Sequence, residues 1–302
     1  MNKTPDTFSG YHPLVNMIYF ASVIGFSMFF MHPITLAISL VCSFIYAVYL
    51  GGKKAVRFGL LFMLPTMIIA AVLNPLFNHQ GATILAYLPN GNPLTLESTM
   101  FGIAAAVMLV TVISWFSCFN TVMTSDKFVY LFGRAIPALS LILSMSLRFV
   151  PRFLAQIKIV ANAQKCIGHD VSSGSIYQKA KHGIKILSIV TTWALENAIE
   201  TAGSMKNRGY GLPRRTAFSI FYFNRRDGRA LAFILLCVTL VISGAFLEIY
   251  RFRYFPTMMH TANNWHNIWA IALFIIYFAL CALPLIINIR EDLIWKRIIS
   301  KI

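Results

Sequence analysis

The residues best suited to chemistry lie in a short run from Met205 to Gly211, where a helical pattern ends. Arg208 carries five N–H donors in a planar fork that fits a carboxylate, and Gly209 follows it directly. This chemistry is recognition, not bond breaking. The alternative interpretation is structural: a basic residue at a helix C-terminus complements the helix dipole, and glycine caps it.

Catalytic patterns are missing from the sequence. The apolar segments carry almost no acid, base or histidine, although an intramembrane enzyme or proton relay needs such groups. The five cysteines form no CxxC pair or Cys/His cluster, so neither a metal site nor a disulfide framework is indicated. We therefore expect a protein that is not an enzyme and has no cofactor. A membrane enzyme acting on a lipid would need metal-binding acids, which the sequence does not offer.

Composition places these residues in a membrane protein. Hydrophobic residues make up 58% of the 302 residues and charged ones 12%, with a mean hydropathy of +0.68. A membrane-spanning helix needs about 20 apolar residues. The sequence predicts an all-α polytopic fold with about six spans, at Leu14–Met31, Pro33–Leu50, Phe58–Phe77, Thr99–Thr121, Ala230–Ile249 and Asn267–Ile289.

The distribution of charge predicts the topology. Of the 26 lysines and arginines, 16 lie in Val122–Arg229 and none in the loop Asn78–Ser98. Cytoplasmic loops are enriched in basic residues, so both termini and the basic insert are expected on the cytoplasmic side of the membrane. The same distribution accounts for the net charge of +16 without nucleic-acid binding. The expected regions are 1–134 with four spans, 135–228 as a cytoplasmic or interfacial coupling-helix region, and 229–302 with two spans.

The insert must position Arg208. Ala135–Leu147 is apolar but short, and we expect it to be partly immersed or interfacial. A helix is predicted to start near Arg148 with Pro151 in its first turn. After a turn at His169–Ser175, a second helical pattern runs from Ile176 to Arg208, interrupted by Gly183 and Gly203.

Side chains of the second helix predict how it packs. Small residues every four positions favour close helix contact, although alanine is also simply the best helix former. Glu196 and Glu200 carry like charges one turn apart and need a basic neighbour, which the preceding helix can supply. We therefore expect crossed helices whose packing uses Ala194, Ala198, Ala202, Glu196 and Glu200.

The order of these pieces resembles the transmembrane T component of energy-coupling factor (ECF) transporters, the EcfT/CbiQ family of ABC-type vitamin and metal importers. The resemblance is carried by Ser146–Pro151, by the basic helix to Gly168, and by the run from Met205 to Gly211. His12-Pro-Leu-Val15 and the apolar run after Pro137 are similar too. The resemblance covers essentially the whole chain.

The resemblance implies two cytoplasmic coupling helices, each ending in an Ala-Arg-Gly signature that docks into an ATPase subunit. Asn207-Arg208-Gly209 matches the second signature, with Asn in place of Ala, and Met205 would be an apolar contact beside it. The first signature aligns with Cys166-Ile167-Gly168, where only glycine remains, so Lys165 or packing would have to serve.

The family function implied is that of a non-catalytic subunit. It would join two ATPases, which hydrolyse ATP, to a small substrate-binding (S) membrane subunit for uptake of a vitamin or transition-metal ion. The alternative is a stand-alone secondary transporter or channel, which needs a polar pathway through the spans. Few residues beyond Asn74 and the serines and threonines could line one.

Overall fold

The structure is a computed structural model that separates into two units. Unit 1 joins the residues up to Thr124 to those from Phe221 onward, and unit 2 is Ser125–Ile220. The expected three-region division stays a prediction. The residues described are 6–87, 91–135, 137–169, 175–210, 221–260 and 268–299, with the backbone alone described at 133–135, 137–141, 259–260 and 299.

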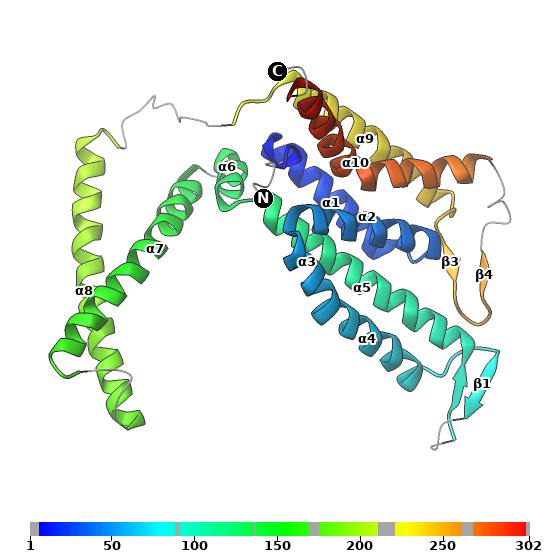
Figure 1. Cartoon of the computed structure of the whole chain (residues 1–302), viewed down its shortest axis with the longest axis horizontal. Helices are drawn as coiled ribbons and strands as arrows, with labels where there is room; N and C mark the ends of the chain where they lie inside the picture. Colours follow the sequence, from blue (N-terminus) through cyan, green and yellow to red (C-terminus); the bar gives the residue numbers. More distant parts are fainter. Residues whose placement is uncertain are drawn as a thin grey trace. The chain divides into compact units, whose positions relative to one another are not determined.

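Unit 1 is built mainly from helices (Figure 1). Within the described residues, five helices are long and apolar enough to cross a membrane: Pro33–Gly51, Lys53–Phe77, Leu96–Val122, Arg225–Phe246 and Ile268–Ile298. The expected first span forms a 17-residue apolar helix, α1, shorter than these. The prediction of an all-α polytopic membrane protein is confirmed. The helices are α1 (Pro13–Phe29), α2 (Pro33–Gly51), α3 (Lys53–Phe58), α4 (Leu64–Phe77), α5 (Leu96–Val122), α9 (Arg225–Phe246) and α10 (Ile268–Ile299).

Short elements complete unit 1. A 3₁₀ turn, η1 (Phe8–Gly10), precedes α1, and a π-helical turn, η2 (Gly59–Met63), joins α3 to α4. Two small antiparallel hairpins connect helices. They pair β1 (Ile84–Tyr87) with β2 (Pro93–Thr95), and β3 (Phe252–Arg253) with β4 (Met259–His260).

The first two helices begin in the same way. His12 precedes Pro13 and His32 precedes Pro33, with proline in the first turn, where its missing N–H costs nothing. The Nδ1 atom of His12 accepts the backbone N–H of Leu14 at 3.3 Å, and that of His32 accepts the N–H of Ile34 at 3.2 Å. The two histidines are therefore helix caps.

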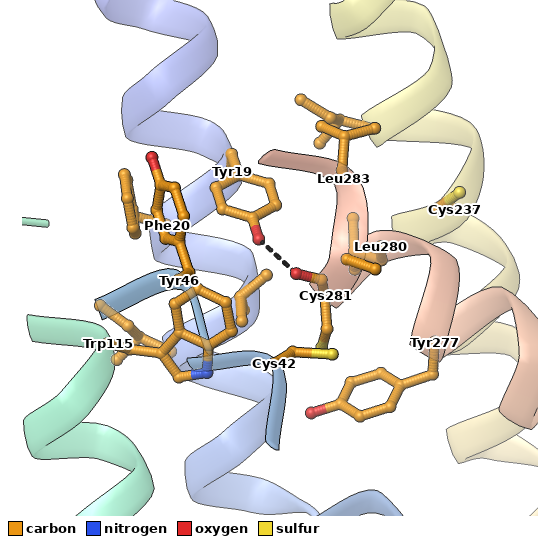
Figure 2. Close-up of a cluster of buried hydrophobic side chains, with 14 of the residues drawn as sticks. Tyr19, Phe20, Cys42, Tyr46, Trp115, Cys237, Tyr277, Leu280, Cys281 and Leu283 are labelled. Atoms are coloured by element: carbon orange, nitrogen blue, oxygen red, sulfur yellow. Dashed lines mark hydrogen bonds between the residues drawn. The ribbon is translucent and has the colours of Figure 1, made fainter. Parts of the chain in front are cut away.

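Helix α1 lies at the centre of the unit 1 core (Figure 2). Tyr19 is fully buried and donates its hydroxyl to the backbone carbonyl of Cys281 in α10, at 3.1 Å. Phe20 packs edge-on against Trp115 of α5, with ring centroids 6.4 Å apart. Eight of the 17 residues of α1 are buried, because other helices of unit 1 surround it on several sides.

The segment before α1 is tied to the ends of later helices. Asn288 of α10 donates its amide to Asp6 Oδ1 at 2.6 Å and accepts the N–H of Thr7 at 2.9 Å. The guanidinium of Arg226 lies 4.2 Å from the ring centre of Tyr11, a cation–π contact. These contacts hold together the two chain segments of unit 1, the one up to Thr124 and the one from Phe221 onward.

Helix α4 packs closely on α5. A Cβ atom on Gly102 would come within 2.7 Å of the carbonyl oxygen of Ala71 and within 3.1 Å of the Cβ of Asn74. Only glycine permits this approach. The other sides of α4 are open, since just 11% of the Lys53–Phe77 window is buried, as expected for a helix that faces lipid.

Unit 2 contains α6 (Ser125–Ala135), α7 (Pro137–Cys166) and α8 (Ile176–Asn207). The predicted helix start near Arg148 is wrong: α7 begins at Pro137, joins the apolar segment to the basic one, and has Pro151 in its interior. Pro151 offers no N–H to the carbonyl of Leu147, but the good helix formers on both sides continue the helix.

Helix α8 begins with a capping box. Ser175 Oγ accepts the N–H of Gln178 at 3.4 Å, and Gln178 Oε1 accepts the N–H of Ser175 at 3.1 Å. The expected interruptions at Gly183 and Gly203 do not occur, because α8 passes through both. Most of the turn expected at His169–Ser175 lies outside the described residues.

Candidate partner-docking site

The two long helices of unit 2 meet through a small apolar contact. Val160 of α7 is buried with Ile186 and Val190 of α8. One turn away on α8, Trp193 receives the ring edge of Phe153, with centroids 5.8 Å apart. The crossing therefore rests on branched and aromatic side chains, which hold two helices that are otherwise largely exposed.

The alanines and glutamates expected to pack the helices lie mostly beyond this contact. Ala194 is half-buried, while Ala198 and Ala202 are exposed. Within the described part of the chain, neither Glu196 nor Glu200 forms an ion pair. Their role in packing stays a prediction.

Helix α8 ends in a glycine cap that places Arg208. The N–H of Gly209 donates to the carbonyl of Lys206 at 3.0 Å, and that of Tyr210 to the carbonyl of Met205 at 3.0 Å. This pair of bonds is the Schellman motif, and it requires the left-handed backbone that Gly209 adopts, with φ of +79°. Arg208 is the C-cap residue, and its side chain is exposed.

Helix α7 ends with the same geometry. The N–H of Gly168 donates to the carbonyl of Lys165 at 3.0 Å, and that of His169 to the carbonyl of Gln164 at 2.9 Å. Gly168 has φ of +83°, and a Cβ there would meet nothing within 4 Å, so conformation alone requires glycine. Ile167 is 68% exposed and occupies the position that Arg208 has on α8.

The two helix ends are therefore equivalent in backbone and different in side chain. The structure places Met205, Arg208 and Gly209 together at one end and Lys165 and Gly168 at the other. One end presents a guanidinium and the other a branched apolar side chain. A partner that binds both helix ends must recognise two different side chains, although the backbone conformation of the two ends is the same.

A histidine pair lies where α7 ends. The rings of His169 and His182 are 4.8 Å apart between centroids. The positive charge of Lys185 lowers the pKa of His169 from its ordinary value, with smaller contributions from desolvation, His182 and Lys181. The neutral form of His169 is therefore favoured in the folded chain.

A groove between α7 and α8 was not anticipated from the sequence. Its volume is about 820 Å³. The four-residue spacing of Arg148 and Arg152 could have indicated a basic face on α7, but only the crossing of the helices brings that face opposite Arg208. The groove is lined by Met145, Arg148, Phe149, Pro151, Arg152, Asn197, Glu200, Thr201, Ser204, Met205 and Arg208.

Comparison with known proteins identifies the family of the chain. Residues 8–218, 211 of the 302, match the model of the CbiQ family, described as cobalt transport protein. The energy-coupling factor transporter transmembrane protein EcfT of Bacillus selenitireducens is 27% identical over 71% of this chain and 84% of its own length. That of Streptococcus equi subsp. equi is 29% identical over 60% of this chain and 69% of its own length.

Other relatives match over shorter segments. The EcfT protein of Lactobacillus helveticus is 31% identical over 37% of this chain, and the matched part spans 41% of the relative's length. The match with Lacticaseibacillus paracasei EcfT, 33% identical over 35% of this chain, likewise spans 41% of that relative. Because the CbiQ model extends from the first buried aromatic residue, Phe8, to beyond both capped helix ends, the chain belongs to the EcfT/CbiQ family of transmembrane T components of ECF transporters.

Proposed function

We propose that this T component couples two cytoplasmic ATPase subunits to a small substrate-binding (S) membrane subunit. ATP-driven motion of the ATPases would move α7 and α8, and the movement would pass to unit 1 and the S subunit. The transported substrate would be a vitamin or a transition-metal ion. The protein would lie in the plasma membrane of a prokaryote, with both termini in the cytoplasm.

One observation carries the proposal: α7 and α8 end in the same glycine cap, and each exposes the residue before the glycine. Two equivalent ends suit two related partners. A rigid cap fixes the direction of the last side chain, so force on Arg208 is transmitted to a helix and not absorbed by a loop. The bidentate fork of Arg208 suits a carboxylate on an ATPase, with Met205 packed beside it.

The proposal is tested by reversing the charge at position 208. Arg208→Glu should abolish co-purification of the ATPase subunits and uptake, while insertion in the membrane is kept. Arg208→Lys keeps the charge but loses the fork, and it should retain part of the binding. Lys158→Glu, in the interior of α7 and away from both helix ends, is the matched control and should bind ATPases normally. Full uptake by Arg208→Glu, or transport by the purified chain alone, contradicts the proposal.

A further inference from the structure

The groove between α7 and α8 concentrates positive charge. Arg148 and Arg152 lie one turn apart on α7, and Arg208 lies at the end of α8. Glu200 is the single acid among the residues that line it, so the lining carries an excess of two positive charges. Within the described chain, none of these four residues forms an ion pair. The lining is therefore complementary to an anionic group.

The positions of the arginines favour a phosphate. Guanidinium groups bind phosphate through paired N–H donors, and Arg148 and Arg152, one turn apart on α7, can donate to the same phosphate. Arg152 is oriented by Trp193, since its guanidinium lies 5.5 Å from the centre of that ring. Ser204 also lines the groove, and its hydroxyl can donate to an anion, whereas Thr201 donates its hydroxyl to the carbonyl of Asn197 at 2.6 Å.

Apolar side chains continue from the basic part of the groove. Met145 and Phe149 line it on α7, one turn or less from Arg148. The neighbouring face of α7 exposes Ile142 by 62%, Val150 by 52% and Leu154 by 57%. A water-filled groove would leave these side chains in water. An occupant with an anionic head and apolar chains would cover both kinds of surface.

We propose that the groove binds one anionic phospholipid, with its phosphate held by Arg148 and Arg152 and its acyl chains along Met145, Phe149 and the exposed face of α7. The lipid would fill the space between the two helices and connect them to the bilayer. The inference rests on the membrane location of the chain and not on the ATPase coupling proposed above.

Lipid binding in the groove is measured by the quenching of Trp193 fluorescence. The full chain is reconstituted in vesicles of phosphatidylcholine and phosphatidylglycerol, and either lipid carries brominated acyl chains that quench tryptophan. The contribution of Trp193 is isolated by subtracting the same measurement on Trp193→Phe. Brominated phosphatidylglycerol should quench Trp193 more than brominated phosphatidylcholine at equal mole fraction.

Three variants separate lipid binding from misfolding. Arg148→Gln/Arg152→Gln should raise the phosphatidylglycerol fraction needed for half-maximal quenching on the order of tenfold, since two charge-assisted contacts are lost. Glu200→Gln removes the acid from the groove and should lower that fraction, a gain that a folding defect cannot produce. Lys158→Gln/Lys179→Gln removes the same charge outside the groove and should leave the fraction unchanged.

Other outcomes overturn the proposal. Equal quenching of Trp193 by the two brominated lipids means that no anionic lipid is selected. Loss of the difference on adding millimolar inorganic phosphate means that the groove takes a free anion. Absence of lipid selection, together with ATPase loss in Arg148→Gln/Arg152→Gln, assigns the groove to an acidic protein surface. Arg208 is unchanged in every variant, so the result is independent of the charge-reversal test at that position.

Discussion

Trp115 of α5 donates its indole N–H to the hydroxyl of Ser39 in α2, at 2.8 Å, in the buried part of unit 1. The same hydroxyl lies 2.7 Å from that of Ser27 in α1. Three helices thus meet at one oxygen atom. Apolar packing holds helices together without fixing their rotation, whereas this hydrogen-bond pair defines which faces meet.

Ser39→Ala should destabilise unit 1 by about 1–3 kcal/mol, because it leaves the buried indole donor of Trp115 without an acceptor. The free energy of unfolding is measured in detergent micelles by tryptophan fluorescence. Ser43→Ala is the control. Its hydroxyl is in the same helix and donates to the carbonyl of Leu40, so its removal leaves no side-chain donor unpaired. Equal stability losses in the two variants would contradict this role of Ser39.

Gly102→Ala should destabilise the contact between α4 and α5. The new methyl group would collide with the backbone carbonyl of Ala71, which cannot rotate away, and overpacking of this kind costs about 1–3 kcal/mol. Gly25→Ala in α1 is the matched control, because a Cβ there meets nothing within 4 Å. It should be neutral or slightly stabilising, since alanine favours the helix. Thermal unfolding of both variants in one detergent makes the comparison.

The membrane helices could be predicted from hydropathy because burial in lipid requires long apolar runs. The prediction for 33–50 differs from α2 by one residue at the C-terminal end. Helix α10 continues ten residues past Ile289. The apolar run ends at Arg290, but the residues that follow still favour a helix. For the same reason, the charge of Arg148 suggested a boundary within what is a single helix, α7.

The helix ends of unit 2 could be anticipated, but the groove could not. Gly168 and Gly209 are local signals, because a left-handed C-cap depends on the residues next to it. The groove depends on the crossing of two helices at Val160 and Val190. No local pattern fixes that angle. The burial of α1 was also hidden, since its sequence is as apolar as that of a lipid-facing helix.

His169 should titrate below its ordinary pKa of about 6.5. Its folded pKa is lowered, so the folded state binds fewer protons and this site favours folding at neutral pH. That contribution is lost as the pH falls from about 6.5 through the folded pKa. Two-dimensional NMR with labelled histidine measures the value directly.

Lys185→Gln should raise the pKa of His169, since Lys185 makes the largest contribution to the shift. Lys158→Gln is the control, because Lys158 is not among the charges that act on His169. A pKa for His169 that stays the same in Lys185→Gln would exclude the charge of Lys185 as the main cause of the shift.

Ile167→Arg should make the end of α7 resemble that of α8. Both positions are C-cap residues with the same backbone hydrogen bonds, so the new guanidinium would be presented as Arg208 is. If both ends dock ATPases, the variant should bind them more tightly, on the order of tenfold, through added charge-assisted hydrogen bonds. Surface plasmon resonance on reconstituted protein measures the change. Ile167→Gln, polar but uncharged, is the control and should not show the gain.

The contacts of α1 bear on how the chain is made. Tyr19 donates its hydroxyl to the carbonyl of Cys281, 262 positions later in the sequence, and the N–H of Thr7, ahead of α1, donates to Asn288, 281 positions later. Helix α1 precedes α9 and α10 on the ribosome, so its polar groups enter the bilayer before their partners exist. In a nascent chain that stops before α10, the phenol of Tyr19 therefore lacks the carbonyl that accepts its hydrogen bond in the folded protein.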